Sequence, residues 1–414
     1  MAYNGVSEPR FYIDEIQYLQ SVGFDFEKYY EDNYYDGYPI QDDFNLGLQK
    51  ETYNSITNVF NLSPHNQKDL GMFNYPPDND TIPIRKKYID IPATFSNLEG
   101  SNIGRYLGIL NHKLKWEEEY NYLRTNGGIE SKWLHKDSDE QWIETERIGE
   151  GILNYDASNN FPILNDGSSI IKFDSSSEHF NPPNNKSFYR LYFEKSFGDD
   201  ALTGLFENFG FGALSYGIYY DLRSPDLDIE MTTEFDGFSS TKTLGGSSLT
   251  NIRYAGSPWW YDVNANKREP FQVYYPEEIE SGANTPISKR NGRRVWNLKF
   301  SYLADTDIFA SNYMSNKYYE HSSSDSVDSV YDDAGDLDDS VDAKNFRYTL
   351  EEDNSFMAQV INRISNGQKF IFQPDKNNNN PDQFAICMLD EDEFSIKQVA
   401  YRTYEFSLKI REVW

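Results

Sequence analysis

The residues with which this chain could bind a transition metal are few and far apart. The single cysteine is Cys387. The five histidines are scattered along the chain: His65, His112, His135, His179 and His321. Helical zinc sites and zinc fingers take their ligands from Cys or His pairs only a few positions apart, and no such pair occurs. We therefore expect no metal site, and no sequence pattern indicates another cofactor.

One segment contains the residue types that calcium prefers. Residues 375–382 read Asp-Lys-Asn-Asn-Asn-Asn-Pro-Asp, and carboxylate and amide oxygens are common calcium ligands. The segment departs from an EF-hand loop, because Asn380 stands where that loop requires glycine and Ile386 where it requires a bidentate glutamate. The spacing therefore favours a solvated loop over a looser calcium site.

Hydrolytic catalysis has no support in the sequence either. The Gly-x-Ser-x-Gly motif of serine hydrolases is absent, and Cys387 lies within the apolar run 384–389, where a buried and unreactive thiol is expected. A glycosidase needs two carboxylates that face each other across the sugar. Among the 67 acidic residues no pair stands out. We predict that the protein is not an enzyme.

The residues best suited to contact a ligand or a partner are three consecutive aromatics, Trp259, Trp260 and Tyr261. Rigid aromatic side chains supply a large contact area at a low cost in conformational entropy, so this cluster could stack on a sugar or on a protein surface. A loop folded over a sheet edge, or a contact between subunits, explains the same residues. We favour these two interpretations over a ligand site.

Composition narrows the classes of partner. The chain has 414 residues, and its 38 Lys and Arg against 67 Asp and Glu give a formal net charge of −29. Nucleic acids and anionic membranes bind clustered cations, so neither is an expected partner. No run of 18 apolar residues could span a membrane, and the first residues lack the basic and apolar segments of a signal peptide. We expect a soluble, acidic protein made in a reducing compartment.

The elements that would position any site are mostly strands. Aromatic residues make up 16% of the chain, and stretches that alternate between apolar and polar residues recur from residue 82 onwards. Turn-forming clusters separate these stretches, and the length of the chain favours more than one domain. We therefore predict a mainly β, multi-domain fold, with a β-sandwich or jelly roll over 82–222 and a second β domain over 223–414.

The alternation is clearest in three strands of the second β region. Their predicted buried faces are Leu227, Ile229, Met231 and Thr233; Trp296, Leu298, Phe300 and Tyr302; and Tyr404, Phe406, Leu408 and Ile410. Gly245–Gly246 marks a turn before a strand. A helix interrupts the strands, with Phe356, Val360 and Ile364 on one face and Gly367 just past its end.

The first 81 residues are predicted to form a helix and an extended arm. Residues 8–23 have a helical period, with Tyr12, Ile16 and Leu19 on one face and Gly23 at the end. The rest of residues 1–81 shows no sustained period. We interpret it as an irregular arm that becomes ordered against another surface, with a long surface loop as the alternative.

A second irregular segment interrupts the C-terminal β region. Residues 322–342 contain eight aspartates and no Lys or Arg. Such a segment cannot bury enough apolar surface to offset the entropy lost on ordering, and its carboxylates repel one another. We predict a mobile acidic insert.

Six phrases spread over the chain resemble those of structural tail proteins of marine tailed bacteriophages. They lie at residues 10–19, 108–114, 224–227, 292–302, 370–375 and 408–414. Region 82–222 is also similar to discoidin-like, galactose-binding-type jelly rolls, through the phrase Ile-Leu-Asn-His and the aromatic strand 188–193. Region 223–414 resembles the tail-tube-like belt domain of distal tail proteins.

This resemblance implies a virion structural protein of the phage tail, made in the host cytoplasm. Distal tail proteins form rings, commonly hexamers, where the tail tube meets the baseplate. Their partners are copies of themselves and other tail proteins, and Trp414 would then be held against its own domain or the adjacent subunit. The alternative is a carbohydrate-binding adhesin that contacts a glycan on the host surface. A polysaccharide-degrading enzyme is a third interpretation and would need two converging carboxylates.

Overall fold

The computed structural model describes the parts of the chain that carry most of the predicted strands. These parts are residues 6–26, 28, 58–64, 68–69, 85–92, 102–112, 115–117, 122–124, 129–136, 142–147, 169–173, 188–195, 210–227, 229–234, 238–252, 292–308, 355–365, 367–379, 383–391 and 393–413. Within them the protein is mainly β, as the sequence predicts, and its helices are short.

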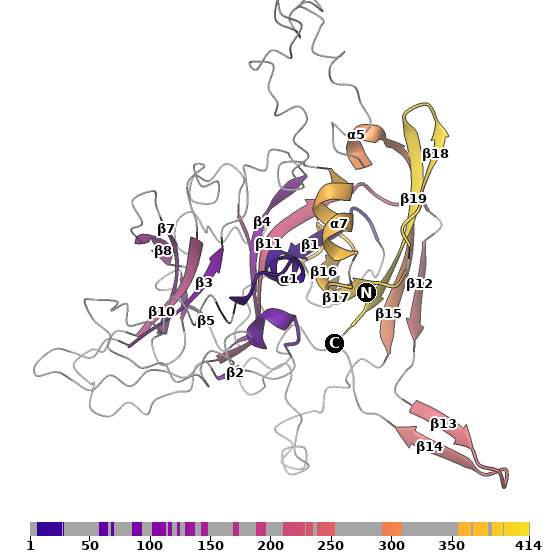
Figure 1. Ribbon diagram of the computed structural model, residues 1–414, viewed down its shortest axis with the longest axis horizontal. Helices are drawn as coiled ribbons and strands as arrows, with labels where there is room; N and C mark the ends of the chain where they lie inside the picture. The colour runs from indigo at the N-terminus through magenta and orange to yellow at the C-terminus, as the bar shows by residue number, and fades with distance from the viewer. Residues whose placement is uncertain are drawn as a thin grey trace, which may run out of the picture.

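The larger sheet has 11 antiparallel strands within the described residues. Its main path runs in the order β12 (Glu230–Glu234), β15 (Arg293–Ala304), β19 (Thr403–Glu412), β17 (Ala385–Leu389), β16 (Phe370–Gln373), β1 (Arg10–Asp14), β11 (Gly210–Asp221), β4 (Ile103–His112) and β9 (Ser169–Phe173). Off this path, β18 (Ile396–Ala400) pairs with β19 and β2 (Lys68–Asp69) pairs with β11. Strand β1 therefore lies in the middle of the sheet, and β12 lies at one end (Figure 1).

A second sheet of six strands packs beside β4 and β11 (Figure 1). Its strands are β3 (Arg85–Pro92), β10 (Phe188–Lys195), β7 (Ile129–Lys136), β6 (Tyr122–Arg124) and β5 (Lys115–Glu117), with β8 (Trp142–Arg147) paired to β7. Ile89 and Leu191 from this sheet share one buried cluster with Leu107 and Leu214 from the larger sheet. The two sheets therefore face each other in a sandwich-like arrangement.

The remaining described elements are one hairpin and five short helical segments. The hairpin consists of β13 (Phe238–Lys242) and β14 (Ser248–Ile252), which pair only with each other in the described part of the chain. The helical segments are α1 (Glu15–Ser21), η1 (Asn58–Asn61), α5 (Asp305–Ile308), η6 (Met357–Ile361) and α7 (Asn362–Ile364). None of the described helices is long and apolar enough to cross a membrane.

The larger sheet joins strands from all three predicted segments of the chain. Strand β1 comes from segment 1–81, its neighbour β11 from segment 82–222, and its other neighbour β16 from segment 223–414. Hydrogen bonds of one sheet therefore cross both predicted boundaries, and the division into domains stays a prediction. The acidic insert 322–342 lies outside the described residues.

The start of the chain differs from the helix predicted over residues 8–23. Residues Arg10–Asp14 form strand β1, and α1 begins only at Glu15. The helical period was misleading because the side chains of β1 are buried on both faces of the sheet, so the strand lacks the apolar–polar alternation of a half-buried strand. The predicted end is confirmed: Gly23 has a φ of +99°, and Phe24 N–H donates to Leu19 O at 2.9 Å.

Two other predicted strands form, but some residues of their predicted buried faces are exposed. Strand β12 begins at Glu230 rather than near Leu227, and Met231 is 41% exposed because β12 is the last strand of the sheet. In β15 the pairing with β19 shifts between Phe300 and Leu303. This bulge turns Tyr302 away from the core, so it is exposed although Phe300 is buried.

The other predicted faces are confirmed. In β19, the side chains of Tyr404, Phe406, Leu408 and Ile410 are all buried. The helix after residue 355 also occurs, as the π-helical turn η6 followed by α7, and Gly367 lies just past its end with a φ of +77°.

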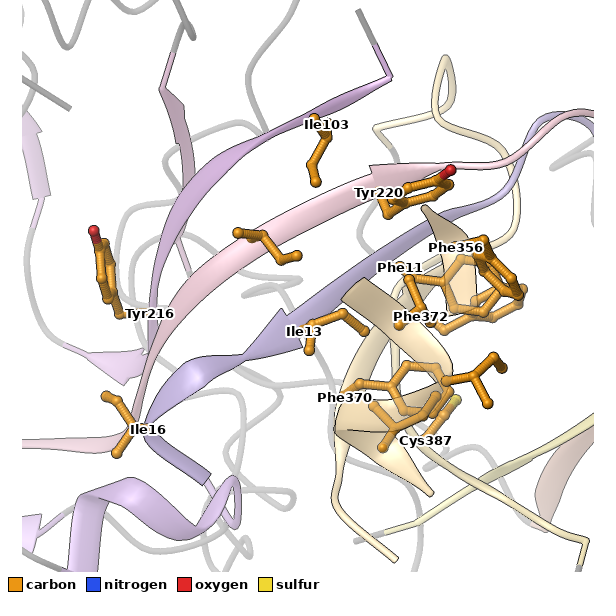
Figure 2. Packing of buried hydrophobic residues seen from close by; sticks show 14 of the residues in the cluster. Phe11, Ile13, Ile16, Ile103, Tyr216, Tyr220, Phe356, Phe370, Phe372 and Cys387 are labelled. Atoms are coloured by element: carbon orange, nitrogen blue, oxygen red, sulfur yellow. The ribbon is translucent and has the colours of Figure 1, made fainter. Parts of the chain in front are cut away.

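The core where these elements meet is built from aromatic rings. Phe11 of β1 contacts Phe356 with ring centroids 5.6 Å apart, and Phe372 of β16 with ring centroids 5.3 Å apart. Figure 2 shows these rings gathered between β1, β16 and the helical turn, with Cys387 beside Phe370. Cys387 is fully buried, as the sequence predicts. Packing of rings around the central strand therefore holds the two ends of the chain together.

Candidate functional site

The residues singled out in the sequence are only partly described by the structure. Trp259, Trp260, Tyr261 and Trp414 all lie outside the described residues. Within the described part of the chain, no group of three or more His, Cys, Asp or Glu side chains could hold a metal ion.

The calcium-like segment is described from Asp375 to Asn379, and its oxygens bind protein donors. The Asp375 carboxylate accepts a hydrogen bond from Asn377 N–H at 3.0 Å, and Gln373 Nε2 donates to the Asn378 carbonyl at 3.0 Å. Lys376 Nζ lies 2.6 Å from the Glu8 carboxylate. These contacts close the turn and attach it to the start of the chain, which favours a structural role for the segment.

Asp14, Ser215 and Tyr106 form a linked set of polar side chains in the described interior. Asp14 caps α1, since its Oδ1 accepts from Ile16 N–H at 2.9 Å. Asp14 also forms a hydrogen bond with Ser215, whose Oγ lies 2.6 Å from the Tyr106 hydroxyl. A carboxylate beside a hydroxyl is a familiar catalytic pair, but Ser215 and Tyr106 are 0% exposed and Asp14 is 3% exposed. A substrate has no access to them, so the set positions α1 against the sheet.

Burial changes the ionisation of this set. Removal from water raises the pKa of Asp14 to about 7, although its hydrogen bonds to Gln17, Ser215 and backbone N–H groups act in the opposite direction. Burial also raises the pKa of Tyr106 well above its ordinary value, and the nearby Asp14 carboxylate adds to the shift. The Asp14 side chain therefore changes its charge near neutral pH inside the core.

Replacing Asp14 with asparagine is expected to change how stability depends on pH. The folded-state pKa of Asp14, about 7, lies above its ordinary value of 3.8, so the folded protein binds the proton more tightly than the unfolded chain. The contribution of Asp14 to the free energy of unfolding is therefore largest below pH 3.8 and is lost as the pH rises through 7. Asparagine keeps the capping oxygen without the charge.

Urea denaturation of wild type and Asp14→Asn at several values between pH 5 and 8 measures this effect. The variant should gain stability relative to wild type as the pH rises, by at most about 1.4 kcal/mol per pH unit below pH 7. A stability difference that is the same at every pH would contradict the raised pKa.

Buried ion pairs fasten β1 and α1 to their neighbours. The Arg10 guanidinium forms two hydrogen bonds to the Asp221 carboxylate and lies over the Tyr219 ring, 4.3 Å from its centroid. Arg363 of α7 donates to the carboxylate of Glu15, and both side chains are almost fully buried. These pairs link the start of the chain to β11 and to α7, so the interior polar chemistry is structural.

The side chains that another molecule could contact therefore lie on the surface, where several large apolar side chains are exposed. Within the described residues they are Val22, Leu227, Met231, Leu244, Leu249, Tyr302, Val399 and Tyr401. Most belong to two places. One is the end of the larger sheet formed by β12 together with the hairpin β13–β14. The other is formed by the β15 bulge and the β18–β19 turn.

The hairpin β13–β14 projects away from both sheets (Figure 1). Its turn is closed by the Thr243 N–H, which donates to Ser247 O at 2.8 Å, and by Gly246 with a φ of +82°. The Ser240 and Ser248 hydroxyls lie 2.7 Å apart across the two strands. Leu244 is fully exposed and Leu249 is 64% exposed. Gly245–Gly246 indicated the turn in the sequence, but nothing indicated that the hairpin would pair with no other strand of the described residues.

We define the candidate assembly surface as β12 and the hairpin β13–β14 that follows it. Strand β12 pairs with β15 on one side only within the described residues, and four of its five side chains are exposed. A sheet edge presents unpaired N–H and C=O groups to another strand. An isolated two-stranded hairpin is at best marginally stable in water. This surface can therefore pair strands with another chain.

Comparisons with protein-family models, with curated proteins and with solved structures find no match to this chain.

Proposed function

We propose that this protein is a structural subunit of a phage tail, which joins copies of itself and other tail proteins through protein–protein contacts. The observation that carries the proposal is the candidate assembly surface, which combines an exposed strand edge with a hairpin that exposes Leu244 and Leu249. An exposed strand edge can pair with a strand of another chain, and assembling proteins use such edges for specific contacts. The phrases that resemble phage tail proteins supply the class of assembly.

Two further features support this function. The polar groups that the structure describes in the interior hold the fold together and are closed to solvent. A net charge of −29 keeps free subunits apart in solution until specific contacts form. In this proposal the subunits form a closed ring, the protein acts in the virion, and its synthesis takes place in the host cytoplasm.

Electron microscopy tests the proposal directly. Antibodies raised against the purified chain should label the tails of the phage whose genome encodes it. Mass spectrometry of those phage particles should find the chain at a constant copy number per particle. Absence of the chain from purified particles would overturn the proposal. Binding of the isolated chain to host polysaccharide, with only substoichiometric and loosely held copies on the tail, would point instead to a carbohydrate-binding adhesin.

A further inference from the structure

We propose that the hairpin β13–β14 of one subunit adds to the exposed edge of β12 in a second copy of this chain. The inference rests on the assembly role proposed above and names the contact that produces it. Each subunit would then offer one hairpin as a donor and one strand edge as an acceptor.

The hairpin has the composition of a segment that pairs with another strand. Residues 238–252 contain a single charged residue, Lys242, and no Asp or Glu, although the chain as a whole carries 67 acidic residues. The described side chains from 240 to 250 are exposed, except for the half-buried Thr243. Adding a third strand would cover Leu249 and stabilise a hairpin that is marginal on its own.

The edge of β12 is suited to accept this hairpin. Glu230 and Glu234 lie at the two ends of β12, on the face opposite Met231, and the described residues of β12 include no Lys or Arg. Asn297 of β15 donates to the Glu230 carboxylate at 3.2 Å, and Arg411 lies 2.8 Å from the Glu234 carboxylate. Both carboxylates therefore already have partners within the subunit, and a hairpin without Asp or Glu brings no further negative charge to this edge. The contact would bring apolar Leu249 to the edge that carries Met231.

Charge also argues against two alternative contacts. If β12 paired antiparallel with β12 of a second copy around Thr232, Glu230 would face Glu234, and like charges directly opposite each other destabilise a sheet. At the β18–β19 end, Arg402 lies in the turn and Lys397 of β18 is paired with Glu405, so a strand that carries Lys242 would meet positive charge there. The β12 edge is therefore the favoured acceptor.

In this proposal the contact runs from head to tail, because each hairpin binds the next copy and is not exchanged reciprocally within a dimer. Only residues 235–237 separate β12 from β13, so donor and acceptor lie next to each other in sequence but use different surfaces. A donor on one subunit that binds an acceptor on the next gives a heterologous interface. Such interfaces generate closed rings or open filaments rather than isolated dimers.

Three matched substitutions of the full chain test the contact by sedimentation velocity over a range of protein concentrations. Leu249→Lys changes the donor, Met231→Lys changes the acceptor, and Tyr401→Lys is the control at the β18–β19 turn. Each adds one positive charge at an exposed apolar side chain, with 64%, 41% and 85% exposure respectively. Near-ultraviolet circular dichroism of each variant confirms that the fold is retained.

Wild type and Tyr401→Lys should form the same large assembly. Leu249→Lys and Met231→Lys should each remain monomeric at concentrations at least about tenfold above the concentration at which half of the wild-type protein is assembled. An inserted lysine blocks an edge contact. Mixed in equal amounts, the two variants should form a dimer and nothing larger. In the mixture, the unchanged hairpin of Met231→Lys can bind the unchanged β12 edge of Leu249→Lys. The opposite pairing, between the changed hairpin and the changed edge, is blocked on both sides.

The inference is overturned if Leu249→Lys assembles like wild type, if the mixture stays monomeric, or if wild type itself stays monomeric. These outcomes differ from failure of the proposed function, which is measured by the presence of the chain in phage tails. If all three lysine variants form rings as well as wild type, the proposed tail role still stands, but the subunit contact lies elsewhere on the chain.

Discussion

The free energy of unfolding should fall by about 3–5 kcal/mol when Arg363 is replaced with methionine, as measured by urea denaturation. The Arg363 guanidinium donates to the Glu15 carboxylate, and the two side chains are 0% and 1% exposed. It also lies over the Tyr18 ring, 4.9 Å from its centroid. Methionine fills much of the same space but leaves the Glu15 charge buried without its cation. The pair joins α1 to α7, so its loss should loosen the contact between the two ends of the chain.

An exposed ion pair is the control. Lys397 Nζ lies 3.1 Å from the Glu405 carboxylate, and the Lys397 side chain is 75% exposed. Lys397→Met should therefore change the stability by less than about 1 kcal/mol. The double variant Glu15→Leu with Arg363→Met should recover much of the loss, because neither charge of this buried pair remains. If Arg363→Met costs no more than Lys397→Met, the buried pair does not hold the two helices together.

Gly217→Ala should destabilise the protein by about 3 kcal/mol or more, since the added methyl group meets backbone that cannot move aside. Gly217 of β11 pairs with Asp14 of β1. A Cβ atom at this position would lie 2.0 Å from the Ile13 carbonyl oxygen and 2.9 Å from the Glu15 backbone nitrogen. The clash would force β1 and β11 apart where Asp14 caps α1. The measurement is the free energy of unfolding in urea.

Gly108 is the matched control for this substitution. It lies on β4, directly beside β11, and pairs with Ser215. A Cβ atom there would come no closer than 3.5 Å to its nearest neighbour, Ser215 Cβ, which is ordinary van der Waals contact. Gly108→Ala should therefore change stability by less than about 1 kcal/mol, because an alanine also lowers the entropy of the unfolded chain. Equal losses at Gly108 and Gly217 would show that strand glycines matter here for reasons other than the close approach of β1.

Much of the β content could be predicted from local sequence. The alternation in β19, with Tyr404, Phe406, Leu408 and Ile410, identified a strand with one buried face, and the structure confirms it. The same holds for Trp296, Leu298 and Phe300 in β15. A period of two is a property of the chain itself, because successive side chains of any strand point to opposite faces. It can therefore be recognised before the partners of the strand are known.

The candidate assembly surface was only partly visible in the sequence. Gly245–Gly246 indicated the hairpin turn, and the low charge of residues 238–252 is a signal that could have directed attention to it. The pattern in Leu227, Ile229, Met231 and Thr233 predicted a buried face, which was wrong. The same apolar residues are buried in the centre of a sheet and exposed at its edge, and the position of a strand in the sheet depends on partners that are distant in sequence.

Local sequence determined the strand-forming character of this chain, its main turns and the burial of Cys387. Only the tertiary structure decided that residues 10–14 form the central strand, between β11 and β16, more than 190 positions away in the sequence. Their apolar spacing is compatible with a helix, and pairing on both sides overrides that local preference. The bulge that exposes Tyr302 and the edge position of β12 arise in the same way. Each is set by which strands meet, and hydrogen bonding between distant segments leaves no periodic trace in the sequence.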